Sequence, residues 1–194
     1  MFDRNKFFDE SLLESAETKK LILDKCRKNI FNAIDLLKNS VSNSGKIMFC
    51  GNGGSAADAQ HLAAEFVIRL AHDLKRPAIG AIALTTDPSM MTAGANDIGF
   101  ENVFARYIEG IGRENDILVG ISTSGNSKNI IKAFEKAKEM GIKTLAMLGG
   151  SGGKLKGMGD CEIIIPSSNT QRIQEGHITV GHILCESVER ELYS

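Results

Sequence analysis

The chain has 194 residues, of which 42% are apolar and 24% are charged, and its net charge is −1. This length suits one α/β domain with a sizeable core, and the near-neutral charge argues against nucleic acid or an anionic membrane as a partner. No apolar run is long enough to span a bilayer, and the N-terminus lacks the apolar core of a secretory signal.

Four cysteines are widely spaced along the chain, and each lies in an apolar stretch: Cys26, Cys50, Cys161 and Cys185. Zinc or redox chemistry would favour closely spaced pairs, which this sequence lacks. We therefore expect buried, reduced thiols and a cytoplasmic protein.

The N-terminal part of the chain predicts helices. Over Leu21–Leu37 apolar residues recur at spacings of three and four, the period of an amphipathic helix, and an earlier helix is predicted over Phe7–Lys19. Three nearby phenylalanines, Phe2, Phe7 and Phe8, are expected to pack on the domain or on a second subunit. We expect a single domain with an N-terminal helical extension over 1–44 and an α/β core over 45–194.

Beyond Gly45, short apolar runs alternate with helical patterns. The runs predict strands at Lys46–Cys50, Ala78–Leu84, Asp116–Ser122, Lys143–Leu148 and Glu162–Ile165. Helices are predicted at Ser55–Leu70, Pro88–Ala95, Glu101–Ile111, Lys128–Met140 and Gln171–Leu192. Parallel strands covered on both faces have such continuous apolar runs, so the pattern predicts a doubly wound, five-stranded parallel sheet flanked by helices. Ligands are then expected at the carboxyl ends of the strands.

Two polar loops follow predicted strands and open predicted helices, at Gly51–Ser55 and Ser122–Ser127. Such a loop presents unpaired backbone N–H groups and the positive end of a helix dipole, which together bind anions. The second loop adds four hydroxyls, and the two loops predict a phosphorylated, hydroxyl-rich ligand, most simply a sugar phosphate. The first loop matches neither the dinucleotide pattern nor a P-loop, so on its own it fits a structural turn equally well.

His61 and Glu65 are four residues apart on the helix that the first loop opens, so they share one helical face. Their neighbours Leu62, Ala63, Ala64 and Phe66 are apolar, which argues against a fully solvated face. A structural ion pair, metal ligation and acid–base work remain alternative roles.

The last predicted helix carries Gln174 and His182, which are separated by about 80° of rotation and about 12 Å of rise in a regular helix. One ion could not easily reach both. Either Gln174 extends from a frayed first turn, or His182 comes from another subunit, and we take the spacing as a sign of a site between subunits.

Four segments together resemble the sugar isomerase (SIS) domain of phosphoheptose isomerases. They occur in the family's order and span essentially the whole chain: Cys50–His61 with Glu65, Ala95–Asp97, Gly120–Ser127 and Arg172–Glu175.

The resemblance implies a flavodoxin-like fold and an enzyme that converts sedoheptulose 7-phosphate to D-glycero-D-manno-heptose 7-phosphate. That reaction is the first step towards the ADP- or GDP-heptose of bacterial surface polysaccharide. The resemblance also implies a cytoplasmic homotetramer with active sites shared between subunits and one Zn²⁺ per subunit. The implied zinc ligands are His61, Glu65, Gln174 and His182, with Glu65 and His182 as the acid–base pair.

The substrate-binding residues that the resemblance implies lie in the same segments and just beyond them. They are Asn52, Gly53, Gly54, Ser55, Glu65, Arg69, Asn96, Asp97, Ser122, Thr123, Ser124, Ser127 and Gln174. The stretch Phe66–Leu70 is more apolar than its counterpart in the family, which leaves the exact sugar open. The physiological metal also stays open, as does the final product: lipopolysaccharide, capsule or S-layer glycan.

Two other classes of function are considered. Relatives of the same build include a non-catalytic tetramer that associates with the replication initiator, and it lacks the carboxylate and histidine found here at Glu65 and His182. A sugar-phosphate-sensing regulator would carry a DNA-binding module, and no helix-turn-helix or basic patch precedes Gly45. The sequence therefore favours the enzyme.

Overall fold

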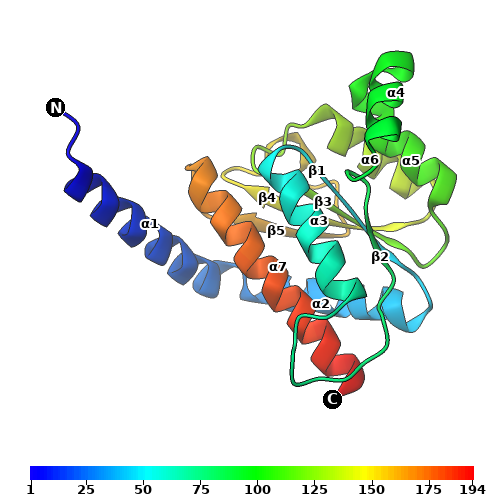
Figure 1. Ribbon diagram of the computed structural model, residues 1–194, viewed down its shortest axis with the longest axis horizontal. Coiled ribbons are helices and arrows are strands. Elements are labelled where there is room, and N and C mark those ends of the chain that lie inside the picture. Colours follow the sequence, from blue (N-terminus) through cyan, green and yellow to red (C-terminus); the bar gives the residue numbers. More distant parts are fainter.

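A five-stranded parallel sheet forms the centre of the protein, whose computed structural model describes residues 1–194 (Figure 1). The strand order is β2-β1-β3-β4-β5, the flavodoxin-like order of a doubly wound sheet, which confirms the predicted fold class. The strands are β1 (Ile47–Gly51), β2 (Ala81–Ala83), β3 (Ile117–Ser122), β4 (Lys143–Gly149) and β5 (Cys161–Ile165).

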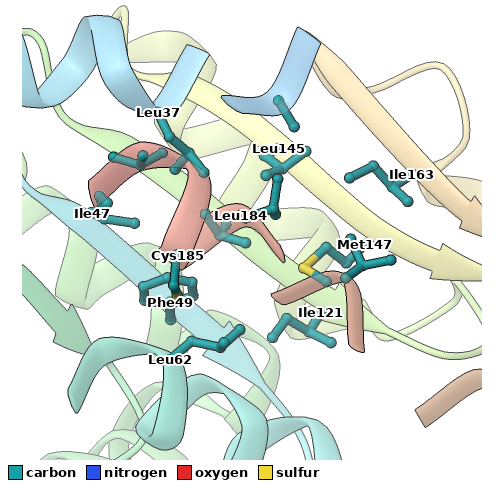
Figure 2. Close-up of a cluster of buried hydrophobic side chains, with 14 of the residues drawn as sticks. Leu37, Ile47, Phe49, Leu62, Ile121, Leu145, Met147, Ile163, Leu184 and Cys185 are labelled. Carbon is teal, nitrogen blue, oxygen red and sulfur yellow. The ribbon is translucent and has the colours of Figure 1, made fainter. Parts of the chain in front are cut away.

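Alternate residues of the central strands enter two separate hydrophobic clusters. In β1, Ile47 and Phe49 face one cluster, whereas Met48 and Cys50 face the other. Both faces are covered, so β1 and β3 are buried along their whole length. Figure 2 shows the larger cluster, where side chains of the sheet meet Leu62 and Leu184.

Helices cover both faces of the sheet. The larger cluster is closed by α2 (Arg27–Ser42), α3 (Gly54–Val67) and α7 (Thr170–Tyr193), and the smaller one by α5 (Val103–Ile111) and α6 (Lys128–Glu139). A further helix, α4 (Pro88–Ile98), has no buried residue and packs against α5 and the 3₁₀ turn Phe100–Asn102. A second 3₁₀ turn spans Gly153–Leu155.

The N-terminal helix α1 (Arg4–Lys25) projects from the body of the molecule (Figure 1). The predicted boundary between Lys19 and Leu21 is wrong, because α1 and α2 meet at Cys26. No glycine or proline marks this break, and the apolar period continues across it; the break forms where α2 turns to pack into the core. Of α1, only Thr18 and Ile22 are buried.

The other predicted elements need small corrections. The first core helix ends at Val67 rather than Leu70, and the strand predicted over Ala78–Leu84 shrinks to three residues at the edge of the sheet. All four cysteines are free, and three of them are buried, as predicted; Cys161 is only partly buried. None of the helices combines the length and the apolar character that crossing a membrane requires.

Candidate functional site

The site is built on two helices, α3 and α7, which lie side by side (Figure 1). Residues that meet across the pair are 119 to 121 positions apart along the chain, so the helices run parallel in a constant register. Gly181 permits this close packing, because a Cβ there would lie 2.6 Å from Cδ2 of Leu62.

The register brings His182 against His61. Their Nε2 atoms are 2.7 Å apart, so one ring donates a hydrogen bond to the other, and the rings meet edge to face. Glu65 lies one turn further along α3, with Oε1 at 3.5 Å from Nε2 of His61. The predicted common face of His61 and Glu65 is thus present, and the side chain of Glu65 is only 19% exposed.

This pairing corrects one inference from the sequence. His182 meets His61 within a single protomer, so the spacing along α7 does not require His182 to come from another subunit. The frayed first turn is also absent, because α7 begins at Thr170 and includes Gln174 in its regular part. Gln174 lies over Gly54 instead: a Cβ on that glycine would be 3.0 Å from the Gln174 side-chain carbonyl carbon.

The donor set can be tested for its fit to zinc. Two imidazoles and a carboxylate converge, which are ligand types that zinc accepts. Two nitrogen ligands of one tetrahedral zinc lie about 3.3 Å apart. The Nε2 atoms of His61 and His182 are closer, at 2.7 Å, which is a hydrogen-bond distance. Gln174 of α7 packs on Gly54, and Gly54 precedes His61 by about 10 Å along α3, so Gln174 is not near the histidine pair. The structure has no group of three or more His, Cys, Asp or Glu residues arranged to hold a metal ion.

The predicted phosphate loop, Ser122–Ser127, leaves β3 at the carboxyl edge of the sheet and enters α6. The buried Ser122 hydroxyl accepts from the backbone N–H of Gly125 and lies 3.1 Å from the Ser127 hydroxyl. Ser127 is the N-cap of α6 but makes no side-chain capping bond, so its hydroxyl satisfies none of the N–H groups in the first turn. Thr123 is partly buried and Ser124 is exposed, as a ligand-facing loop requires.

The Gly51–Ser55 loop is hydrogen-bonded to Asn129, in the helix that follows the phosphate loop, and the sequence did not predict this role for Asn129. Asn52 and Asn129 exchange two amide hydrogen bonds of 2.9 and 2.8 Å. Asn129 is buried in the first turn of α6, two residues beyond Ser127, and that proximity was the signal available in the sequence. At the start of α3, Gly53 adopts φ 55° and also leaves its helix without a side-chain cap.

A buried ion pair that the sequence analysis also missed supports the far end of α3. The side chains of Arg76 and Glu189 are each 1% exposed, and Arg76 donates to the carbonyl oxygen of Glu65 at 2.9 Å. Burial alone would raise the pKa of Glu189, but N–H groups of Ala71 and Leu70 and the Arg76 guanidinium hold it below its usual value. Its partners are 113 to 119 positions away, so no local pattern could reveal them.

Three predicted substrate residues are exposed on the surface of the protomer. Arg69 is exposed just beyond the end of α3. Asn96 and Asp97 are exposed on α4 and bond to each other at 2.7 Å. Figure 1 shows α4 well away from α7, and no hydrogen bond joins Asn96 or Asp97 to the histidine pair.

Comparisons with known proteins show the family of this chain. Residues 12–149 match the SIS domain family. The phosphoheptose isomerase of Pelodictyon phaeoclathratiforme is 48% identical over 98% of this chain and 92% of its own length, and that of Helicobacter pylori strain P12 is 50% identical over 93% of each.

Solved structures are similar over nearly the whole chain. The phosphoheptose isomerase of Neisseria gonorrhoeae has a TM-score of 0.90 at 38% identity, and that of Francisella tularensis has 0.93 at 34%. Each comparison covers 97% of this chain and 100% of the other.

Proposed function

Because the chain belongs to the phosphoheptose isomerase family of SIS-domain proteins, we propose that it is an aldose–ketose isomerase that acts on a heptose phosphate. The proposed reaction converts sedoheptulose 7-phosphate to D-glycero-D-manno-heptose 7-phosphate, towards a surface polysaccharide. The observation that carries the proposal is the meeting of Glu65, His61 and His182 on two helices that begin at the same edge of the sheet as the hydroxyl-rich loop. Relatives that share nearly the full length are phosphoheptose isomerases, which gives no support to a non-catalytic tetramer.

The reaction needs a base that removes a proton from the carbon next to the carbonyl, and an acid that returns a proton to the neighbouring carbon. In this proposal Glu65 and His182 share these transfers. Both approach the imidazole of His61, so a sugar lying over that imidazole would be within reach of both groups. The phosphate would lie at Ser122–Ser127, where hydroxyls and the N-terminus of α6 supply donors.

Zinc is part of the proposal on grounds of family resemblance and donor chemistry. His61, Glu65 and His182 would hold the ion, and Gln174 is retained as a fourth ligand by resemblance alone. When bound, the ion would polarise the carbonyl and hydroxyl oxygens of the sugar. The protein side chains would still orient the substrate and move its protons.

A cytoplasmic homotetramer is also proposed. The support lies in α1, whose large apolar side chains are exposed: Phe7 is 55% exposed, Phe8 62%, Leu12 58% and Leu13 69%. Several exposed large apolar side chains on a projecting helix favour burial against another subunit.

The test is direct. Purified protein is incubated with sedoheptulose 7-phosphate, with and without added zinc after chelation, and formation of the aldose is followed. We expect turnover that zinc restores after chelation. Absence of aldose under every metal condition would overturn the proposed reaction, whereas turnover indifferent to chelation would overturn only the zinc assignment.

A further inference from the structure

A glycine-rich turn follows β4 and lies beside the phosphate loop. Gly150, Gly152 and Gly153 all have positive φ, at 60°, 84° and 57°. Because β4 is the parallel neighbour of β3, the turn leaves the same edge of the sheet as Ser122–Ser127. The proposed function gives these glycines no role.

The two loops are in direct backbone contact. A Cβ on Gly153 would overlap the carbonyl oxygen of Ser124 and lie 2.7 Å from the carbonyl carbon of Gly125. In the other direction, a Cβ on Gly125 would overlap the carbonyl oxygen of Gly152. Atoms of real side chains do not approach this closely, so the contact exists only because these positions lack a Cβ.

Hydrogen bonds fix the contact in place. The N–H of Leu155 donates to the carbonyl of Gly125 at 2.9 Å, and the N–H of Lys154 donates to Oδ1 of Asn126 at 3.1 Å. Asn126 in turn donates to the carbonyl of Ser124 at 2.9 Å. The phosphate loop is therefore held at Gly125 and Asn126 by the backbone of the turn that follows β4.

We propose that Gly153 is a positioning residue for phosphate recognition, holding Ser124 and Gly125 where the loop can bind the phosphate. The inference rests on the proposed function, because it takes Ser122–Ser127 as the phosphate loop. Hydrogen bonds to phosphate tolerate only small displacements, and a shift of about 1 Å can cost up to 100-fold in a substrate-positioning site. A methyl group at Gly153 forces such a shift directly at Ser124.

Gly153→Ala is the test variant, and Gly150→Ala is its matched control. Both glycines lie in the same turn with nearly equal φ, so alanine strains the backbone similarly at each. At Gly150, however, the nearest atom to a Cβ is the carbonyl oxygen of Ser167, at 3.6 Å, outside the phosphate loop. Two quantities are measured: kcat and KM for sedoheptulose 7-phosphate, and the inhibition constant for inorganic phosphate.

We expect Gly153→Ala to raise KM and the phosphate inhibition constant about tenfold or more, with kcat within about threefold of wild type. Gly150→Ala should keep both constants near wild type. Equal effects of the two variants, or an effect of Gly153→Ala on kcat alone, would overturn the proposal. If Ser124→Ala leaves phosphate inhibition unchanged, the phosphate loop itself is misassigned, which is a failure of the proposed function.

A second variant covers the case in which Gly153→Ala does not fold. Asn126→Ala removes the acceptor for Lys154 and the donor to Ser124 but introduces no overlap. We expect a smaller rise, about threefold to tenfold, in the same two constants, as loss of one or two neutral hydrogen bonds predicts. Wild-type constants in a folded Asn126→Ala protein would overturn the positioning role.

Discussion

The Glu65 side chain is largely buried but makes few contacts that stabilise the fold. Its carboxylate lies 3.5 Å from His61 and makes no other ion pair. Glu65→Gln keeps the shape but removes the base, so we expect activity to fall at least about 10²-fold. The free energy of unfolding should change by less than about 1 kcal/mol. Steady-state kinetics and urea unfolding check the two expectations, and turnover at the wild-type rate would refute the catalytic role.

Ser124 is the exposed hydroxyl of the phosphate loop. Ser124→Ala removes one donor to a charged acceptor, which is worth about 1.5–3 kcal/mol, and we expect the loss mainly in KM. The exposed Ser42, at the end of α2, provides the control, because Ser42→Ala removes a hydroxyl at the opposite edge of the sheet. Unchanged KM and kcat in Ser124→Ala would place the phosphate elsewhere.

Asn129 connects the two ligand loops through the two hydrogen bonds that its side-chain amide exchanges with Asn52. Asn129→Ala leaves Asn52 without these partners and also removes the acceptor for the N–H of Ile130. We expect a loss of about 1–3 kcal/mol in the free energy of unfolding. In a double-mutant cycle with Asn52→Ala, the two effects should be non-additive by about 0.5–3 kcal/mol. Strict additivity would show that the amide pair does not couple the loops.

At the scale of elements, local patterns predicted the helix face that carries His61 and Glu65, because a spacing of four residues fixes it. They could not predict that His182 meets His61. That contact depends on the register between α3 and α7. Gly181 of α7 packs on α3, and the buried Arg76–Glu189 pair joins α7 to the segment that follows α3, so residues far apart in the sequence set this register. Similarly, the break at Cys26 follows from tertiary packing rather than from any helix-ending residue.

His177 links α7 to the end of β4. It is fully buried, its Nε2 lies 2.9 Å from the carbonyl oxygen of Leu148, and burial lowers its pKa to about 4. In the unfolded chain its pKa is about 6.5, so between pH 6.5 and 4 the unfolded state binds the proton first. Stability is therefore complete above about pH 6.5 and declines as the pH falls towards 4.

We expect the free energy of unfolding to drop by about 2 kcal/mol between pH 7.5 and pH 5 on account of His177. In His177→Gln this part of the drop should vanish, whatever the overall stability of the variant. Urea unfolding at the two pH values provides the comparison. The same pH dependence in both proteins would assign it to other groups.

At the scale of the molecule, alternation of apolar runs with helical patterns was enough to predict the sheet, because each strand is buried on both faces. The assembly of subunits could not be predicted in the same way. One protomer supplies His61 and His182 together, but its Gln174 packs on Gly54, about two turns before His61. Asn96 and Asp97 lie on α4, which Figure 1 shows away from α7. A shared site is therefore still a prediction, now supported by Gln174, by α4 and by the exposed apolar side chains of α1.

Mixed oligomers test the sharing. If α4 of a second subunit completes each site, His182→Ala subunits mixed with Asp97→Ala subunits should regain part of the activity. His61→Ala mixed with His182→Ala should stay inactive, because both histidines belong to the same protomer. Native mass spectrometry confirms that subunits exchange. No recovery in the first mixture, with exchange confirmed, would contradict a shared site.

The constant register of α3 and α7 limits how the length of this chain can vary. One residue inserted into either helix before its histidine would advance that side chain by about 1.5 Å and rotate it by about 100°, which would separate the imidazoles. Insertions in the turns at the opposite edge of the sheet, such as Asn43–Gly45, would leave the pair intact. Homologous chains that keep the activity should therefore show gaps and insertions at that edge and none between Gly54 and His61 or between Gln174 and His182.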